Sequence, residues 1–203
     1  MPHHPTGAGK SSYDLIDRQR FWSGFSLKPG MTIVDLACGA GRYTTEMAEK
    51  IGPEGRIIAI DLWEEGIDQI NRSTQSKGLR IETHVADVGN DLPVADRCVD
   101  LCLMATVLHD LVHDGLAQAA LRQVARILKP AGILSVIEFK KQDGPPGPPR
   151  QIRLRLEEVS MLLLPVGLIR FSPVVDLGPD LWFAEFKRLG GQSATARPEK
   201  SPE

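Results

Sequence analysis

A glycine turn with an acidic residue in front of it is the part of the sequence best suited to bind a ligand. Residues 33–36 form a short, mostly apolar run typical of a buried strand, Gly39 and Gly41 form the turn, and a helical pattern begins at Arg42. Strand, glycine turn and helix in this order bind phosphates in nucleotide-binding α/β proteins. The sequence therefore predicts a ligand site at this turn.

Two residues distinguish this turn from one that binds a diphosphate. Asp35 lies four residues before Gly39, and Thr44 stands where the dinucleotide pattern has its third glycine. A carboxylate repels a pyrophosphate at close range but attracts an ammonium group, and the free N–H groups of a helix N-terminus favour a carboxylate. S-adenosylmethionine carries adenosine, a sulfonium and an amino-acid tail, so we expect it as the cofactor.

The segment 35–41, Asp-Leu-Ala-Cys-Gly-Ala-Gly, resembles motif I of class I S-adenosylmethionine-dependent methyltransferases, D-x-G-C-G-x-G. Ala37 stands where that family usually has glycine, and its methyl group should narrow the freedom of the turn. The resemblance covers roughly residues 10–189 and is nearest to small-molecule enzymes of the ubiquinone/menaquinone-biosynthesis type. It implies that the turn binds the cofactor through Asp35, Ala37, Cys38, Gly39 and Gly41.

Two further acidic residues follow the next two predicted strands. Asp61 lies 20 residues after Gly41, the spacing of the acid that binds ribose hydroxyls in Rossmann-like folds, although it could instead cap the next helix. Asp87 stands where members of the family bind the adenine amino group, although it could instead form an Asx turn. With the resemblance, Leu62, Val88 and Ala105 join these acids as expected cofactor-binding residues.

The stretch after the fourth predicted strand allows several interpretations. Residues 109–113, His-Asp-Leu-Val-His, are similar to the H-E-x-x-H zinc signature, but the sequence offers no obvious third ligand and we expect no metal. Methyltransferases of this kind often have a Val-Leu-His stretch here, which implies that His109 lines the acceptor pocket; a capping or loop-bonding role is equally open.

Glu138 ends the fifth predicted strand, at the edge of the sheet where ligands bind in open α/β folds. It could be a base, a substrate contact or the partner of a nearby Lys or Arg. If the acceptor must lose a proton, His109 and Glu138 are the candidate catalytic residues.

The remaining pattern supplies the elements that position these residues. Five strand–helix units followed by two strands predict an α/β fold, a Rossmann-like, mostly parallel seven-stranded sheet with helices on both faces and a C-terminal antiparallel hairpin. The expected strands cover residues 33–36, 56–60, 79–86, 98–104, 133–137, 168–177 and 182–187. The expected helices cover about 12–22, 42–51, 63–77, 114–128 and 151–164.

The sequence predicts three regions along the chain. Residues 1–24 are expected to be a flexible start and an N-terminal helix that caps the site, 25–189 the methyltransferase domain, and 190–203 a disordered polar tail.

The composition is that of a soluble globular protein. The 203 residues are 42% hydrophobic and 25% charged, and the net charge of −2 gives no electrostatic case for nucleic acid or an anionic membrane as partner. No apolar run approaches the roughly 18 residues of a membrane helix. The polar start and the three cysteines, taken as free thiols, predict a cytoplasmic location.

The predicted function is transfer of a methyl group from S-adenosylmethionine to a small-molecule acceptor. Two alternatives remain open from the residues: an NAD-dependent Rossmann oxidoreductase, and a non-catalytic protein that binds S-adenosylmethionine. The acceptor, its attacking atom and the oligomeric state are left open.

Overall fold

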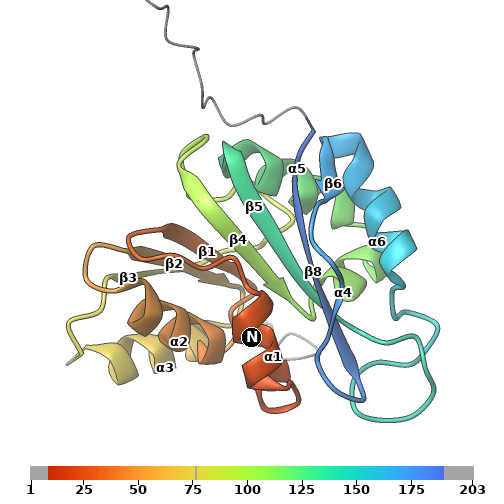
Figure 1. Cartoon of the computed structure of the whole chain (residues 1–203). Coiled ribbons are helices and arrows are strands. Elements are labelled where there is room, and N and C mark those ends of the chain that lie inside the picture. The colour runs from red at the N-terminus through yellow and green to blue at the C-terminus, as the bar shows by residue number, and fades with distance from the viewer. Residues whose placement is uncertain (1–8, 76, 190–203) are drawn as a thin grey trace, which may run out of the picture.

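The computed structural model describes residues 9–75 and 77–189, and these form a sheet with helices on both faces (Figure 1). The strand order is β3-β2-β1-β4-β5-β8-β6, and β7 pairs with β8. The strands are β1 Thr32–Leu36, β2 Arg56–Asp61, β3 Ile81–Val85, β4 Val99–Ala105, β5 Leu128–Phe139, β6 Leu168–Arg170, β7 Val175–Asp176 and β8 Leu181–Arg188. The α-helices are α1 Arg18–Gly24, α2 Arg42–Ile51, α3 Glu64–Thr74, α4 Leu108–His113, α5 Ala117–Ile127 and α6 Leu156–Leu163, and two short 3₁₀ helices are η1 Ser12–Asp14 and η2 Leu164–Val166.

The first five strands are parallel, and β8 runs antiparallel to β5, β6 and β7. The apolar runs of the first five strands favour this parallel arrangement. A parallel strand is covered by helices on both faces of the sheet and therefore needs apolar side chains on both faces. On one face Val34 and Cys102 pack with α4, α5 and α6; on the other Ile33 and Leu101 pack with α1 and α2. The predicted fold class is confirmed.

The expected strand 168–177 is in fact two strands, β6 and β7, so the sheet has eight strands instead of seven. Pro173, which has no backbone N–H, lies in the break. The hydroxyl of Ser172 accepts the N–H of Glu185 at 3.1 Å. A side chain here replaces the regular backbone ladder between the strands.

The expected N-terminal helix over 12–22 was wrong, because the chain forms η1, a break and then α1. Asp17 is the N-cap of α1, and its carboxylate accepts the N–H of Arg20 at 3.1 Å. An aspartate that caps a helix starts a new one instead of continuing the old one. The backbone N–H of Asp17 donates to Leu177 O at 2.8 Å, which joins this corner to the end of β7.

Further boundaries differ from the expectation, among them that of the fifth strand, which begins at Leu128 and not at 133. The stretch 109–113 forms most of α4, so the following helix starts at Ala117 and not at 114. The expected helix over 151–164 begins only at Leu156, where the Glu158 carboxylate accepts the N–H of Arg155 at 2.7 Å. The expected tail 190–203 lies outside the described residues.

Replacing Gly41 by alanine should cost more stability than the same change at Gly30. Both glycines are left-handed, with φ of 75° and 77°, so each alanine should cost about 1 kcal/mol of backbone strain. A Cβ at Gly41 would also lie 2.5 Å from Cγ1 of the buried Ile70, whereas a Cβ at Gly30 meets nothing within 4 Å. We expect urea unfolding to show a further loss of about 1–3 kcal/mol for Gly41→Ala. Equal losses in the two variants would contradict this account.

Candidate active site

The glycine turn is built from residues in the left-handed conformation. Ala37, Gly39 and Gly41 have φ of 60°, 55° and 75°. A Cβ built on Gly39 meets nothing within 4 Å, so the backbone of the turn is open at this point. The methyl group of Ala37, by contrast, costs about 1–2 kcal/mol in this conformation. The family's usual glycine would avoid that cost, so the turn holds backbone strain.

The two departures from the dinucleotide pattern contact each other. Thr44, in the first turn of α2, donates its hydroxyl to Asp35 Oδ2 at 2.6 Å. Both residues are buried, with exposures of 0% and 1%. The threonine in place of the third glycine therefore joins the helix to the strand through a hydrogen bond, where a glycine would allow only close backbone packing. Sequence reasoning placed Asp35 against the ligand; the structure places it beneath the turn.

Asp61, at the end of β2, holds the turn from the other side. Its Oδ2 accepts the N–H of Gly39 at 2.7 Å, and its Oδ1 accepts the N–H of Trp63, the N-cap residue of α3, at 2.8 Å. The carboxylate thus supports the start of the helix and the glycine turn together. Cys38 is fixed in the same way, because its N–H donates to Ile60 O at 3.1 Å.

The two carboxyl groups of the turn have no basic partner among the described side chains. Among the described residues, neither Asp35 nor Asp61 forms an ion pair with a Lys, Arg or His side chain. Burial raises the pKa of Asp35 to about 7; the Thr44 hydrogen bond opposes the shift and the charge of Asp61 adds to it. The turn is therefore an acidic site that a cationic ligand would stabilise.

Asp87 follows β3, and its carboxylate forms an Asx turn. Its Oδ1 accepts the N–H of Gly89 at 2.8 Å, and its Oδ2 accepts from Asn90 Nδ2 at 3.2 Å. The adenine contact expected from the family stays a prediction beside this local role. Ala86 donates its N–H to Asp61 O at 3.0 Å, so this loop starts beside the turn.

The apolar residues expected to contact the cofactor differ in exposure. Leu62 is 44% exposed, Val88 is 9% exposed and Ala105, the last residue of β4, is half-buried. Thr106, the next residue, has φ of 54°, so the ends of the adjacent strands β1 and β4 each carry a left-handed residue that is not glycine. Such outliers gather where a backbone is held in place for function.

A cavity of about 440 Å³ borders the outer side of the turn. It is lined by Tyr13, Gly41, Arg42, Glu46, Gln69 and Lys77, and by none of Asp35, Asp61 and Asp87. We therefore do not assign this cavity to the cofactor.

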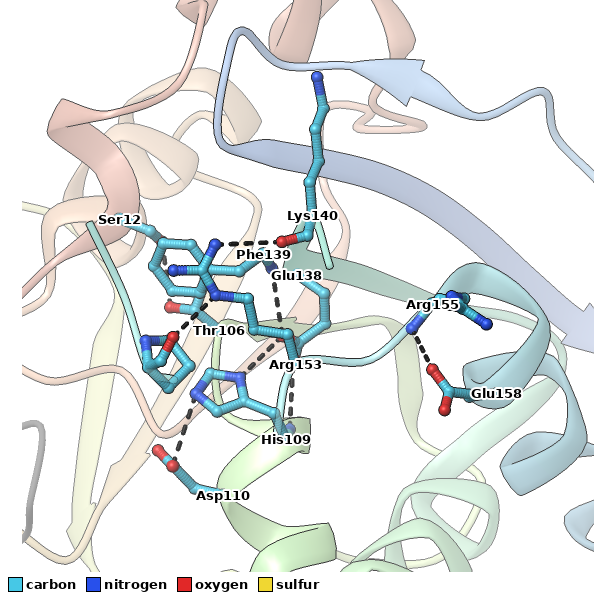
Figure 2. A network of polar contacts seen from close by, with 11 residues as sticks. Ser12, Thr106, His109, Asp110, Glu138, Phe139, Lys140, Arg153, Arg155 and Glu158 are labelled. Carbon is cyan, nitrogen blue, oxygen red and sulfur yellow. Dashed lines mark hydrogen bonds and ion pairs between the residues drawn. The ribbon is translucent and has the colours of Figure 1, made fainter. Parts of the chain in front are cut away.

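His109 and Glu138, which the sequence offered separately, are hydrogen-bonded to each other. His109 Nδ1 lies 2.7 Å from Glu138 Oε2, and the backbone N–H of His109 donates to Glu138 Oε1 at 3.1 Å (Figure 2). Burial by itself lowers the pKa of His109, but the hydrogen bond and charge of Glu138 outweigh it and the pKa is raised. His113, the second histidine of the zinc-like stretch, is exposed. Among the described residues, no three His, Cys, Asp or Glu side chains are grouped as a metal site.

Sequence reasoning missed Arg153, which organises the loop beside this pair. Its buried guanidinium donates to the carbonyls of Lys140, Gly144, Pro146 and Pro148 at 2.6–3.1 Å. The guanidinium also lies 5.4 Å from the ring centre of Phe139, as Figure 2 illustrates. The Gly/Pro-rich stretch 143–149 signalled a loop, but no local pattern indicates which arginine binds it.

Comparison with known proteins identifies the family. Residues 27–163 match the methyltransferase domain family. The chain belongs to this family. A solved S-adenosylmethionine-dependent methyltransferase from Aquifex aeolicus superimposes with a TM-score of 0.76 at 29% identity, covering 87% of this chain and 92% of that one. The predicted family, class I S-adenosylmethionine-dependent methyltransferases, and the predicted cofactor are thereby confirmed.

The chain is also similar to two curated enzymes whose names refer to menaquinone or ubiquinone. It is 26% identical over 129 residues to the demethylmenaquinone methyltransferase of Lactobacillus johnsonii, covering 63% of this chain and 52% of that protein. It is 29% identical over 148 residues to the ubiquinone/menaquinone biosynthesis C-methyltransferase of Ectopseudomonas mendocina, covering 66% and 56%. The chain thus spans little more than half the length of these relatives. No helix in the described part of the chain is long and apolar enough to cross a membrane.

Replacing Asp35 by asparagine should remove a pH-dependent loss of stability in the unliganded protein. The folded-state pKa of about 7 lies above the unfolded value near 3.9, so the folded protein binds more protons in between and stability falls as pH rises from about 4 to about 7. Asparagine mimics the protonated form. We expect urea unfolding to show Asp35→Asn more stable than wild type by roughly 1–3 kcal/mol at pH 8, with a difference about a third as large at pH 5.

Asp68→Asn provides the control, because Asp68 is an exposed acid on the neighbouring helix α3. Its stability should follow that of wild type at every pH. Parallel curves for wild type and Asp35→Asn would show that the Asp35 carboxyl does not titrate between folded and unfolded states as described.

Proposed function

We propose that this chain transfers the methyl group of S-adenosylmethionine to a hydroquinone, an aromatic ring made electron-rich by its hydroxyl groups. The names of the two curated relatives connect those proteins with menaquinone and ubiquinone, which supports this acceptor class. The nicotinamide oxidoreductase finds no support in the family or in the relatives.

The observation that carries the proposal is the pair of uncompensated carboxylates at the glycine turn. Asp35 and Asp61 have no basic partner among the described side chains, and both lie at the carboxyl ends of adjacent strands. S-adenosylmethionine supplies an ammonium group and a sulfonium whose methyl group is already activated. A unit charge at 4 Å from a carboxylate is worth about 4 kcal/mol at an effective dielectric constant of 20, enough to fix the orientation of the ligand.

Around these acids the proposal gives each neighbouring residue a part in cofactor binding. The open backbone at Gly39 permits close approach, and the remaining lone pairs of Asp61 accept from the ribose hydroxyls. Asp87 and Val88 contact the adenine, and Leu62, 44% exposed, packs against it. The remaining expected residues would contact the cofactor through their backbone; these are Ala37, Cys38, Gly41 and Ala105.

The segment before α1 covers this site in the proposal. Ser12 Oγ lies 3.1 Å from the hydroxyl of Tyr43 and accepts from Thr106 Oγ1 at 3.2 Å. A Cβ built on Gly9 would lie 3.8 Å from the Trp63 ring. The segment therefore passes from the start of α3 to the end of β4, along the edge where the turn lies. Of the expected region 1–24, residues 9–24 would form this cover, whereas 1–8 lie outside the described residues; 25–189 would form the methyltransferase domain.

Methylation of a hydroquinone at carbon or oxygen releases one proton. His109, in α4 shortly after β4, is hydrogen-bonded to Glu138 at the end of β5, and in this proposal the pair takes part in removing that proton. Positioning and exclusion of water supply the remaining rate enhancement, because the methyl group needs no further activation.

Asp61→Asn should weaken cofactor binding, because asparagine cannot accept from both the backbone and the ribose with two oxygens. Isothermal titration of the full chain should show a roughly 10- to 100-fold higher Kd for S-adenosylmethionine, about 1.4–2.7 kcal/mol. Asp68→Asn serves again as the control and should bind as wild type. Unchanged affinity in Asp61→Asn would remove this residue from the site.

The activity itself is tested with the wild-type chain and 1,4-dihydroxynaphthalene kept reduced under anaerobic conditions. Formation of S-adenosylhomocysteine together with a methylated naphthol supports the proposal. Tight binding of S-adenosylmethionine with no turnover on a panel of quinols, phenols and amines would indicate a non-catalytic binding protein. Preferential binding of NAD would overturn the cofactor assignment.

A further inference from the structure

The two residues offered as catalytic base are closed off from any acceptor. Glu138 is 0% exposed and His109 is 3% exposed. The side chain of Asp110, which follows His109 at the start of α4, is 47% exposed. Of these three residues, Asp110 is thus the one that a ligand can reach directly.

Each nitrogen of the buried imidazole faces a carboxylate. Nδ1 lies 2.7 Å from Glu138 Oε2, and Nε2 lies 3.5 Å from Asp110 Oδ1. Figure 2 shows Asp110 on the side of the His109 ring opposite to Glu138. The three side chains therefore form a line from the inside of the sheet to the accessible end of α4.

The surrounding charges support proton exchange along this line. Burial lowers the pKa of His109, but Glu138 and then Asp110 raise it and the Arg153 guanidinium opposes them, with a raised pKa as the result. Burial raises the pKa of Asp110; His109 and His113 oppose this and Asp114 adds to it. A general base is most effective when its pKa lies near the working pH, and a raised pKa brings the Asp110 carboxyl closer to neutral pH.

We propose that Asp110 is the carboxylate through which the proton of the methyl acceptor leaves, with His109 and Glu138 as the buried residues that position and polarise it. This inference rests on the proposed methyl transfer. It gives the catalytic contact to Asp110, which lies within the zinc-like stretch 109–113 but was not among the candidate catalytic residues of the sequence.

The step balances without a further reactant. A bond forms between the acceptor carbon or oxygen and the methyl carbon, while the methyl–sulfur bond breaks and its electron pair stays on sulfur. The proton of the acceptor passes to the Asp110 carboxylate, which His109 Nε2–H stabilises on its other oxygen, and then to water. The products are the methylated acceptor, S-adenosylhomocysteine and a solvated proton.

The matched variants are Asp110→Asn and Asp114→Asn. Asp114 lies one helical turn further on, is exposed and carries the same charge, and the structure gives its carboxylate no hydrogen bond among the described residues. With 1,4-dihydroxynaphthalene as probe, we expect Asp110→Asn to lower kcat at least about tenfold with the KM for S-adenosylmethionine within about twofold, and Asp114→Asn to stay within about twofold in both.

A second measurement needs no acceptor. NMR titration of the imidazole signals, with His109→Gln to assign them, gives the pH midpoint of His109 in each chain. The midpoint should fall by at least about half a pH unit in Asp110→Asn and by clearly less in Asp114→Asn, because only Asp110 faces Nε2.

The two measurements separate the inference from the function on which it rests. Turnover by wild type with equal kcat in both variants would overturn the role of Asp110. Absence of S-adenosylhomocysteine from wild type would overturn the hydroquinone acceptor, and equal His109 midpoints in the two variants would still overturn the proton path. A lower midpoint and a lower kcat that are confined to Asp110→Asn would support the path.

Discussion

The structure depends on one buried carboxylate, that of Asp35, held beneath the glycine turn by the hydroxyl of Thr44. A buried charge without a basic partner destabilises the fold, and burial raises the pKa of this acid to about 7. A hydrophobic residue in its place would pack well in the same strand. A cation bound at the turn would stabilise this carboxylate and offset the loss of stability that its burial causes in the unliganded protein.

Backbone strain at the same edge follows the same logic. Ala37 and Thr106 are left-handed without being glycine, and they follow the adjacent strands β1 and β4. Asp61 holds the turn by its hydrogen bond to Gly39. Strain of this kind persists only where surrounding hydrogen bonds and packing fix the backbone. The family's glycine would relax position 37, so this chain has a stiffer turn than the usual motif.

The acidic turn and the His109–Glu138 pair are two separate groups of buried polar side chains. The turn holds a carboxyl whose pKa burial raises to about 7, and the pair holds a histidine whose pKa is raised by its hydrogen bond and charge contact with Glu138, against the effect of burial. Arg153 lies beside the His109–Glu138 pair and fixes the neighbouring loop through four backbone carbonyls. Its guanidinium is therefore occupied by hydrogen bonds within the chain. Because one fold supports many different reactions, the chemistry of a given protein depends on individual side chains such as these.

The sequence by itself determined the order of the elements, the parallel sheet and the glycine turn between β1 and α2, because apolar runs and glycine spacing are local patterns. It also placed Asp61 and Asp87 at strand ends by counting residues. It failed at the N-terminal helix, where the cap at Asp17 starts a new helix, and at the break between β6 and β7.

Only the tertiary structure decided which side chains meet. His109 and Glu138 are 29 residues apart and come together because β4 and β5 pair in register, with Ala105 opposite Ile137. The contact of Thr44 with Asp35 and the carbonyl partners of Arg153 depend in the same way on how helix and loop pack on the sheet. No periodicity in the chain encodes such pairs, because each depends on the register and packing of segments that are distant in sequence.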